Sequence, residues 1–195
     1  MSDKASQTKQ LDDDQKMSRA QDTFIYEAIK YMESGYPMER GQGTVSLNKA
    51  GELSIKGLNE DKSRIDWDVK VTGSMKGSWP NFEIVTNSTV DQAGTVVHKE
   101  NANYKTGVSK EEYYFANGKN DKSNVMTGSC QTFDDSSKVC DFKLDGGTAH
   151  VEQGPSKDDV TKSKISMKTA DGEQSIDFTY TTSGKIGTYS YEKSK

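Results

Sequence analysis

The sequence predicts a mainly β fold: an antiparallel meander of about eleven strands that forms a curved sheet, barrel or half-barrel, with one N-terminal amphipathic α-helix packed on it. Two observations carry this prediction. Helical periodicity is confined to one N-terminal segment, and the rest of the chain alternates apolar and polar residues between turn signals spaced about every 10 to 14 residues. Because no helical pattern follows residue 35, parallel strands joined by helical crossovers are not expected.

The helix is expected over residues 12–35. Its apolar residues recur at steps of three and four positions, which places them on one face of a helix. They are Met17, Ala20, Phe24, Ala28 and Tyr31, with Ile25, Ile29 and Met32 beside them. Asp12–Asp14 favour the start of the helix through its macrodipole, and Gly35 followed by Pro37 predicts its end. The polar face is mixed in charge, so we expect packing on the sheet rather than binding to or crossing a membrane.

The segment before the helix is polar and without periodicity. Residues 1–11 are therefore expected to form a disordered polar tether. Residues 12–195 are expected to form a single β-rich domain, with its antiparallel strands within 41–192.

Apolar residues that face each other across a turn predict the register of several hairpins. The turns expected from glycine positions are Lys49–Gly51, Lys76–Gly77, Gly146–Gly147, Asp171–Gly172 and Ser183–Gly184. The predicted pairs are Val45 with Ile55, Val71 with Phe82, Cys130 with Cys140, Phe142 with Val151, Ile165 with Phe178, and Phe178 with Tyr189. Since neighbouring hairpins agree on which residues face the core, their strands are expected to share one apolar face.

The composition narrows the functional classes. A net charge of −4 and a pI near 5.3 argue against nucleic acid as a partner, because nucleic-acid binding needs a concentrated basic face. Leu, Ile, Val and Phe make up only 31 of the 195 residues, which predicts a lean aliphatic core partly filled by Tyr and Met. Such a core favours an open or curved sheet with one wet face over a tightly packed sandwich.

The only two cysteines, Cys130 and Cys140, are expected to form a disulfide across a hairpin. A disulfide implies the periplasm, the cell surface or secretion, and the alternative is a pair of reduced, buried thiols in a cytosolic protein. The expected location is the periplasm or the outer membrane or cell surface. Met1 followed by a polar tether resembles a mature bacterial lipoprotein whose first, lipidated cysteine has been replaced. This resemblance implies export and a lipid anchor at the native N-terminus. No transmembrane segment is expected, because the helix has only about 20 residues and several of them are charged.

No catalytic, metal or cofactor motif is present. The register places His150 on the wet face, whereas it leaves His98 unplaced, and the acidic pairs lack the spacing of a calcium loop. We therefore expect no enzyme activity, no metal and no cofactor; an enzyme that uses carboxylates ranks third among the functional hypotheses.

The favoured function is a non-enzymatic exported binding or carrier protein that holds an apolar or amphipathic small molecule in the concavity of a curved β-sheet. The candidate ligand-binding residues are Trp67, Phe82, Tyr189, Tyr191 and Trp79. Most of these aromatics could equally belong to an ordinary core, and Trp79, beside a turn proline, is the better candidate for an exposed contact. The alternative function is an envelope or cell-surface protein-interaction module without a small-molecule pocket, whose partner is an envelope protein.

Overall fold

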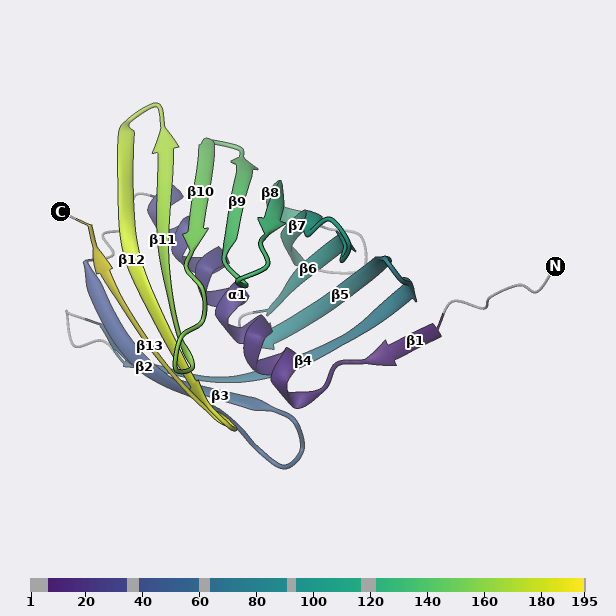
Figure 1. Ribbon diagram of the computed structural model, residues 1–195. Coiled ribbons are helices and arrows are strands. Elements are labelled where there is room, and N and C mark those ends of the chain that lie inside the picture. The colour runs from purple at the N-terminus through teal and green to yellow at the C-terminus, as the bar shows by residue number, and fades with distance from the viewer. Residues whose placement is uncertain (1–6, 35–38, 60–63, 91–93, 117–121, 195) are drawn as a thin grey trace.

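The computed structural model describes residues 7–34, 39–59, 64–90, 94–116 and 122–194, and these form a closed antiparallel β-barrel with one helix (Figure 1). The strands are β1 (Gln7–Gln10), β2 (Arg40–Leu47), β3 (Leu53–Asn59), β4 (Arg64–Ser78), β5 (Asn81–Val90), β6 (Gly94–Asn103), β7 (Val108–Ala116), β8 (Lys122–Thr132), β9 (Lys138–Leu144), β10 (Gly147–Gln153), β11 (Val160–Thr169), β12 (Gly172–Ser183) and β13 (Ile186–Lys193). Each of β2 to β13 pairs with its neighbours in the chain, and β2 also pairs with β13, which closes a twelve-stranded barrel. The predicted fold class is confirmed.

Strand β1 lies outside this ring and differs from the predicted tether. Residues 74–77 of the long β4 extend past the end of β3, so one edge of this stretch is left for another strand. Residues 7–10 pair with that edge, and Gln7 lies opposite Gly77. An uncovered strand edge is a template for pairing, which is the physical reason that a polar segment without periodicity becomes a strand here. Residues 1–6 of the expected tether lie outside the described residues.

The helix α1 (Asp13–Glu33) has the predicted extent and lies inside the barrel. Asp12 caps its N-terminus in a capping box with Gln15. Phe24 packs on Tyr189 of β13 with ring centroids 4.4 Å apart, and Tyr26 stacks on Tyr113 of β7 at 5.5 Å. Strands β13 and β7 are on opposite sides of the ring, so a helix that contacts both lies between the two walls, as Figure 1 shows. The predicted stop signals, Gly35 and Pro37, lie outside the described residues.

The core combines the apolar face of α1 with the inner face of the strands. Its fully buried side chains include Tyr26, Ile29, Val45, Leu53, Met126, Ile165, Met167 and Ile176. Aromatic rings also fill the interior where the neighbouring strands carry glycine: the ring of Tyr189 lies over Gly43 and Gly57, which pair with each other across β2 and β3. A lean aliphatic content is therefore sufficient, because the helix and the rings occupy the interior.

The predicted registers are partly right. The pairs Val45 with Ile55 and Cys130 with Cys140 are observed. The others are shifted: Val71 pairs with Ser88 instead of Phe82, Phe142 with Ala149 instead of Val151, Ile165 with Ile176 instead of Phe178, and Phe178 with Tyr191 instead of Tyr189.

The shifts at the C-terminal hairpins come from the turns. A type I′ turn needs positive φ at both central residues, whereas only Gly172 and Gly184 adopt it and Asp171 and Ser183 do not. The turn between β11 and β12 is therefore centred one residue earlier than predicted, and the turn between β12 and β13 one residue later. Each partner moves by an even number of residues, so every side chain stays on its predicted face of the sheet.

Candidate binding site at one end of the barrel

Exposed aromatic side chains gather at one end of the barrel. In a closed antiparallel barrel alternate turns lie at the same end, and the turns β4–β5, β6–β7 and β8–β9 belong to one end. Trp79, Tyr104 and Phe133 on these turns are 69%, 50% and 50% exposed, and Val108 at the start of β7 is 44% exposed. With the partly buried Phe82 of β5, these residues are called the aromatic end below.

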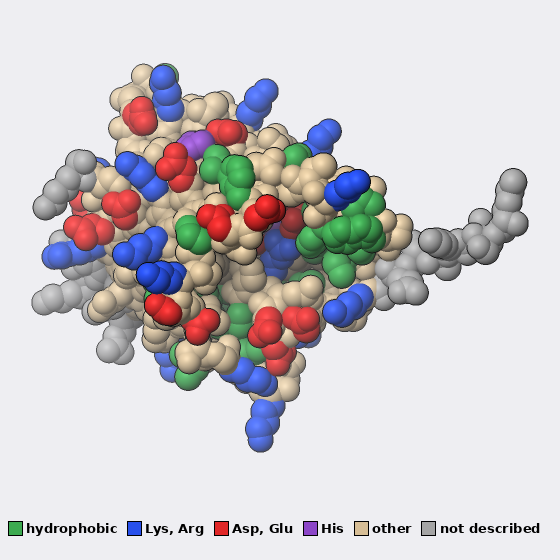
Figure 2. Space-filling model, in the orientation of Figure 1, with side chains coloured by type: hydrophobic (Ala, Val, Ile, Leu, Met, Phe, Trp, Pro, Cys, Tyr) green, Lys and Arg blue, Asp and Glu red, His purple; other side chains and the backbone are tan. Residues whose placement is uncertain are grey.

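Contacts join two turns of the aromatic end, those of Trp79 and Tyr104, and Phe133 of the third turn lines a pocket together with Tyr104. The backbone amide of Tyr104 donates to the carbonyl of Pro80 at 2.8 Å, which holds the turn of Trp79 against that of Tyr104. The rings of Phe82 and Tyr104 meet edge to face with centroids 5.3 Å apart. Figure 2 shows apolar side chains gathered on the right of the view, where Figure 1 places the ends of β4 and β5. A contiguous apolar patch of this kind typically marks an interaction site.

A small pocket opens into the barrel within the aromatic end. Its volume is about 210 Å³. Tyr104 and Phe133 form its rim, and the inward-facing Glu100 and Ser109 lie at its inner part. The pocket therefore connects the exposed surface with a cluster of charged side chains inside the barrel.

The charged cluster holds α1 to the wall of the barrel. The guanidinium of Arg19 on α1 donates to Glu100 of β6 at 2.7 Å and to Asp22 at 2.9 Å, and lies 3.4 Å from Nδ1 of His98. Because a guanidinium can only donate, Nδ1 of His98 accepts and its Nε2 carries the proton. Nε2 then donates to the buried carboxylate of Glu111 on β7.

Glu111 has two further partners. The hydroxyl of Ser109 donates to it at 2.6 Å, and the ammonium of Lys138 on β9 lies 3.7 Å away. The ring of Tyr113 stacks on that of His98 with centroids 4.0 Å apart. Side chains from α1, β6, β7 and β9 thus form one network around His98.

The carboxylates dominate the electrostatics of this cluster. Burial by itself lowers the pKa of Arg19, but nearby carboxylates, led by Asp22, outweigh burial and raise it. The pKa of Lys138 is raised against the effect of burial for the same reason. Burial by itself raises the pKa of Glu111, but the hydrogen bond from His98 and the charge of Lys138 hold it well below its usual range. Arg19, Lys138 and Glu111 therefore keep their charges at neutral pH.

Three groups in the cluster have donor atoms suited to a metal ion. The side-chain donor atoms of His98, Glu100 and Glu111 lie within 4.8 Å of one another. Arg19 and Lys138 already supply positive charge to both carboxylates, and Nε2 of His98 carries a proton that a metal ion would have to displace. Chemically, the arrangement is a paired salt-bridge network that positions α1.

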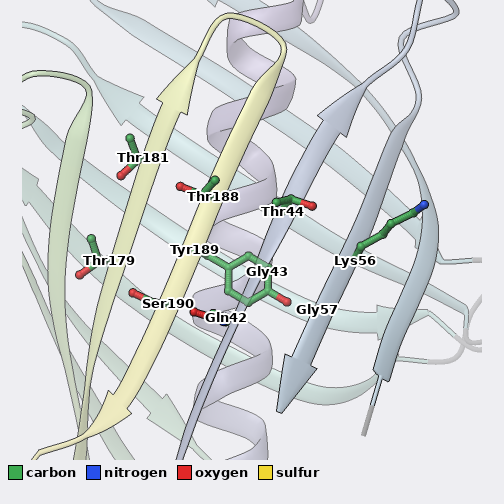
Figure 3. A pocket seen from close by; sticks show the side chains of 10 residues that line it. All are labelled: Gln42, Gly43, Thr44, Lys56, Gly57, Thr179, Thr181, Thr188, Tyr189 and Ser190. Carbon is green, nitrogen blue, oxygen red and sulfur yellow. The ribbon is translucent and has the colours of Figure 1, made fainter. Parts of the chain in front are cut away.

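A second, open depression lies on the outer face of β2, β3, β12 and β13. Its volume is about 600 Å³, and Figure 3 shows the hydroxyl-rich side chains around it. Its lining is Gln42, Gly43, Thr44, Lys56, Gly57, Thr179, Thr181, Thr188, Tyr189 and Ser190. Only the buried Tyr189 offers an aromatic ring, from behind the glycines, so this face presents hydroxyl groups to water and no exposed apolar anchor.

The five sequence-predicted site residues do not form one site. Tyr189 and Tyr191 face the interior from β13, where Tyr189 is buried against Phe24. Trp79 and Phe82 belong to the aromatic end instead, and the side chain of Trp67 lies outside the described part of the chain. Trp79 is exposed, as its position beside a turn suggested.

The predicted disulfide is confirmed. Cys130 and Cys140 are bonded and join β8 to β9 below the turn that carries Phe133. The bond therefore anchors one of the three turns of the aromatic end.

The charged cluster was missed by the sequence analysis, although a signal for part of it exists. His98 and Glu100 lie two and four residues after the buried Val96 on β6, so all three side chains point to the same face of the strand. Glu111 and Tyr113 share a face on β7 in the same way. That alternation places all three inside the barrel. His150 instead lies on the outer face, where the hydrogen bond to Asp141 raises its pKa.

Fold and surface together define a class: a helix-filled antiparallel barrel with an aromatic rim. No protein-family model, no curated protein and no solved structure matches the chain. Within the described residues, no helix combines the length and the apolar character needed to cross a bilayer.

Proposed function

We propose that this protein is a non-enzymatic, exported binding module that docks on its target through the aromatic end. The observation that carries the proposal is the exposure of Trp79, Tyr104 and Phe133 on three adjoining turns. Aromatic side chains supply much of the free energy of association at binding surfaces, because they bury a large area at a small cost in side-chain entropy. A lone exposed ring needs no explanation, but a contiguous group on separate turns does.

The filled interior supports docking over the carriage of a ligand in the barrel. Phe24 of α1 packs against Tyr189, so the helix occupies space on the inner face where a carrier would hold its ligand. A groove of about 650 Å³ beside Phe82 and Val108 at the same end is open to solvent, whereas the pocket that leads from the aromatic end into the barrel measures about 210 Å³. That volume is below the ~300 Å³ at which pockets for ordinary small-molecule ligands begin.

The disulfide supports an exported location. Disulfides persist in oxidising compartments and are rare in the cytosol. The proposal therefore places the protein in the periplasm or at the outer membrane or cell surface, with Cys130 and Cys140 oxidised.

Site-specific photo-crosslinking in the native host tests the proposal. A photoreactive amino acid is introduced singly at Trp79, Tyr104 or Phe133, and at the exposed Glu173 beside the turn β11–β12 at the opposite end as the matched control. We expect adducts, to protein or to lipid, at the three aromatic positions and not at the control. Adducts of equal yield at Glu173, or no adducts at any position in correctly folded protein, would contradict the proposal.

A further inference from the structure

The N-terminal strand β1 pairs with the edge of β4 at the aromatic end. Gln7, the first residue of β1, lies opposite Gly77, two residues before Trp79. Any chain or anchor that precedes Gln7 is therefore attached beside the exposed rings. A lipid anchor on that segment would bring this end of the barrel to a bilayer and keep the opposite end away from it.

The residue types of the aromatic end fit the interface of a bilayer. Tryptophan and tyrosine rings prefer the headgroup level, because each has an apolar body and one polar group. Trp79 and Tyr104 are of this type, and Phe133 adds a purely apolar ring on a third turn. Three turns can insert separately and to a shallow depth, so no backbone group has to leave its hydrogen-bonded strand.

Lysines flank the exposed rings. Lys76 and Lys110 line an outer groove with Phe82, and Lys105 lines the pocket within the aromatic end. A lysine in this position can reach lipid phosphates while its aliphatic stem remains in apolar surroundings. Acidic residues in the same linings, Glu83 and Asp134, offset part of the positive charge. Insertion of the rings, rather than net charge, should therefore dominate binding.

We infer that the target of the aromatic end is the surface of a phospholipid bilayer, with Trp79, Tyr104 and Phe133 inserted at the level of the headgroups. The inference rests on the proposed docking function and names its target. It also predicts an orientation: α1 begins near the bilayer, at the end where Lys185 pairs with Asp13, and runs away from it through the barrel.

Vesicles of phosphatidylethanolamine and phosphatidylglycerol test the inference with the full chain. Replacing Trp67 with phenylalanine leaves Trp79 as the sole tryptophan reporter, since the chain holds two tryptophans. We expect the emission of Trp79 to shift to shorter wavelength when vesicles are added, and the protein to sediment with them.

Substitutions separate ring insertion from charge. Trp79→Ala, Tyr104→Ser and Phe133→Ser should each weaken the partitioning by about tenfold, as expected for the loss of one inserted ring. Val125→Ser, at a partly exposed apolar residue of the opposite end, is the matched control and should change it less than about twofold. Circular dichroism verifies that each variant is folded. Raising the salt concentration should weaken partitioning less than any ring substitution does.

The outcomes distinguish the inference from the proposed function. The inference would be overturned if the protein did not sediment with the vesicles and the emission of Trp79 in the Trp67→Phe variant did not shift. Binding abolished by salt but insensitive to the ring substitutions would also overturn it. In either case, photo-crosslinks from the aromatic end to a protein would leave the docking function standing with a protein target. Absence of both would reject the two together.

Discussion

Replacing Arg19 with methionine is expected to lower the free energy of unfolding by about 3 kcal/mol. Arg19 binds Glu100 at 2.7 Å and Asp22 at 2.9 Å, and the side chains of Arg19 and Glu100 are only 14% and 12% exposed. Removing one partner of a buried ion pair costs about 3–5 kcal/mol, because the other charge stays buried without compensation. The lower end of that range applies here, since some water reaches both side chains. Methionine retains much of the apolar packing of the arginine stem.

Urea unfolding followed by far-ultraviolet circular dichroism measures the decrease in the free energy of unfolding. A double-mutant cycle with Glu100→Gln assigns that decrease to the ion pair of Arg19 and Glu100. The double variant should be less destabilised than the sum of the single variants, by about 2 kcal/mol. In a domain of this size, the loss for the single Arg19 variant corresponds to a decrease of about 6–12 °C in the melting temperature. Lys185→Met, which breaks the exposed pair with Asp13, is the control and should cost less than about 1 kcal/mol. Additive single effects, or a loss below about 1 kcal/mol for the Arg19 variant, would refute the assignment of α1 docking to this network.

Three further predictions concern the interior and the disulfide. The pKa of Glu111 is lowered from 4.5 to about 2, so its stabilising effect is complete above about pH 4.5 and is lost as the pH falls toward 2. In the Glu111→Gln variant, the free energy of unfolding measured by urea titration should therefore decrease less on acidification than in the wild type. The same decrease with pH in both proteins would count against this prediction. Gly57→Ala should cost about 1–3 kcal/mol because the added methyl group meets the hydroxyl of Tyr189, and a Tyr189→Phe background should recover part of that loss in thermal unfolding. Replacing both Cys130 and Cys140 with serine should cost about 2.7 kcal/mol, the chain-entropy value for a separation of 10 residues, and an unchanged urea midpoint would contradict it.

Features set by short-range patterns could be predicted from the sequence. The bounds of α1 follow from its apolar periodicity and from the aspartates at its start, and Asp12 indeed caps it. The face of the sheet to which each side chain points follows from the two-residue period of a strand. These orientations were therefore predicted correctly even where the register was wrong. The Cys130–Cys140 bond lies within one hairpin, where the two residues are only 10 positions apart.

The exact turns could not be predicted, because they depend on the backbone conformation of single residues. Asp171 was expected to adopt positive φ in a type I′ turn, and it does not. A turn displaced by one residue moves each partner in the hairpin by two, as at Ile165 and Ile176. The hydrophobic pattern cannot detect such a displacement, because it repeats every two residues.

The charged cluster could not be predicted for a different reason. Alternation indicates that His98 and Glu100 point inward, but their partner Arg19 lies about 80 residues away on a helix. Only the closed barrel, with α1 inside, brings these residues together. The sequence analysis expected the helix on the apolar face and placed no residue of the sheet against Arg19, so His98 was left without a role.

The size of the barrel explains why the fold needs an internal helix and the charged cluster, whereas it does not explain the exposed aromatic rings. Side chains alone fill the interior of a barrel of about eight strands, whereas twelve strands leave more space than a lean aliphatic core can occupy. The helix fills that space, and the polar side chains that it carries inward must find partners, which accounts for Arg19 and its cluster. Neither the closure of the barrel nor the filling of its interior requires the side chains of Trp79, Tyr104 and Phe133 to be exposed to water. Their exposure to water is not needed to build the described barrel, and for this reason we assign the proposed docking role to them.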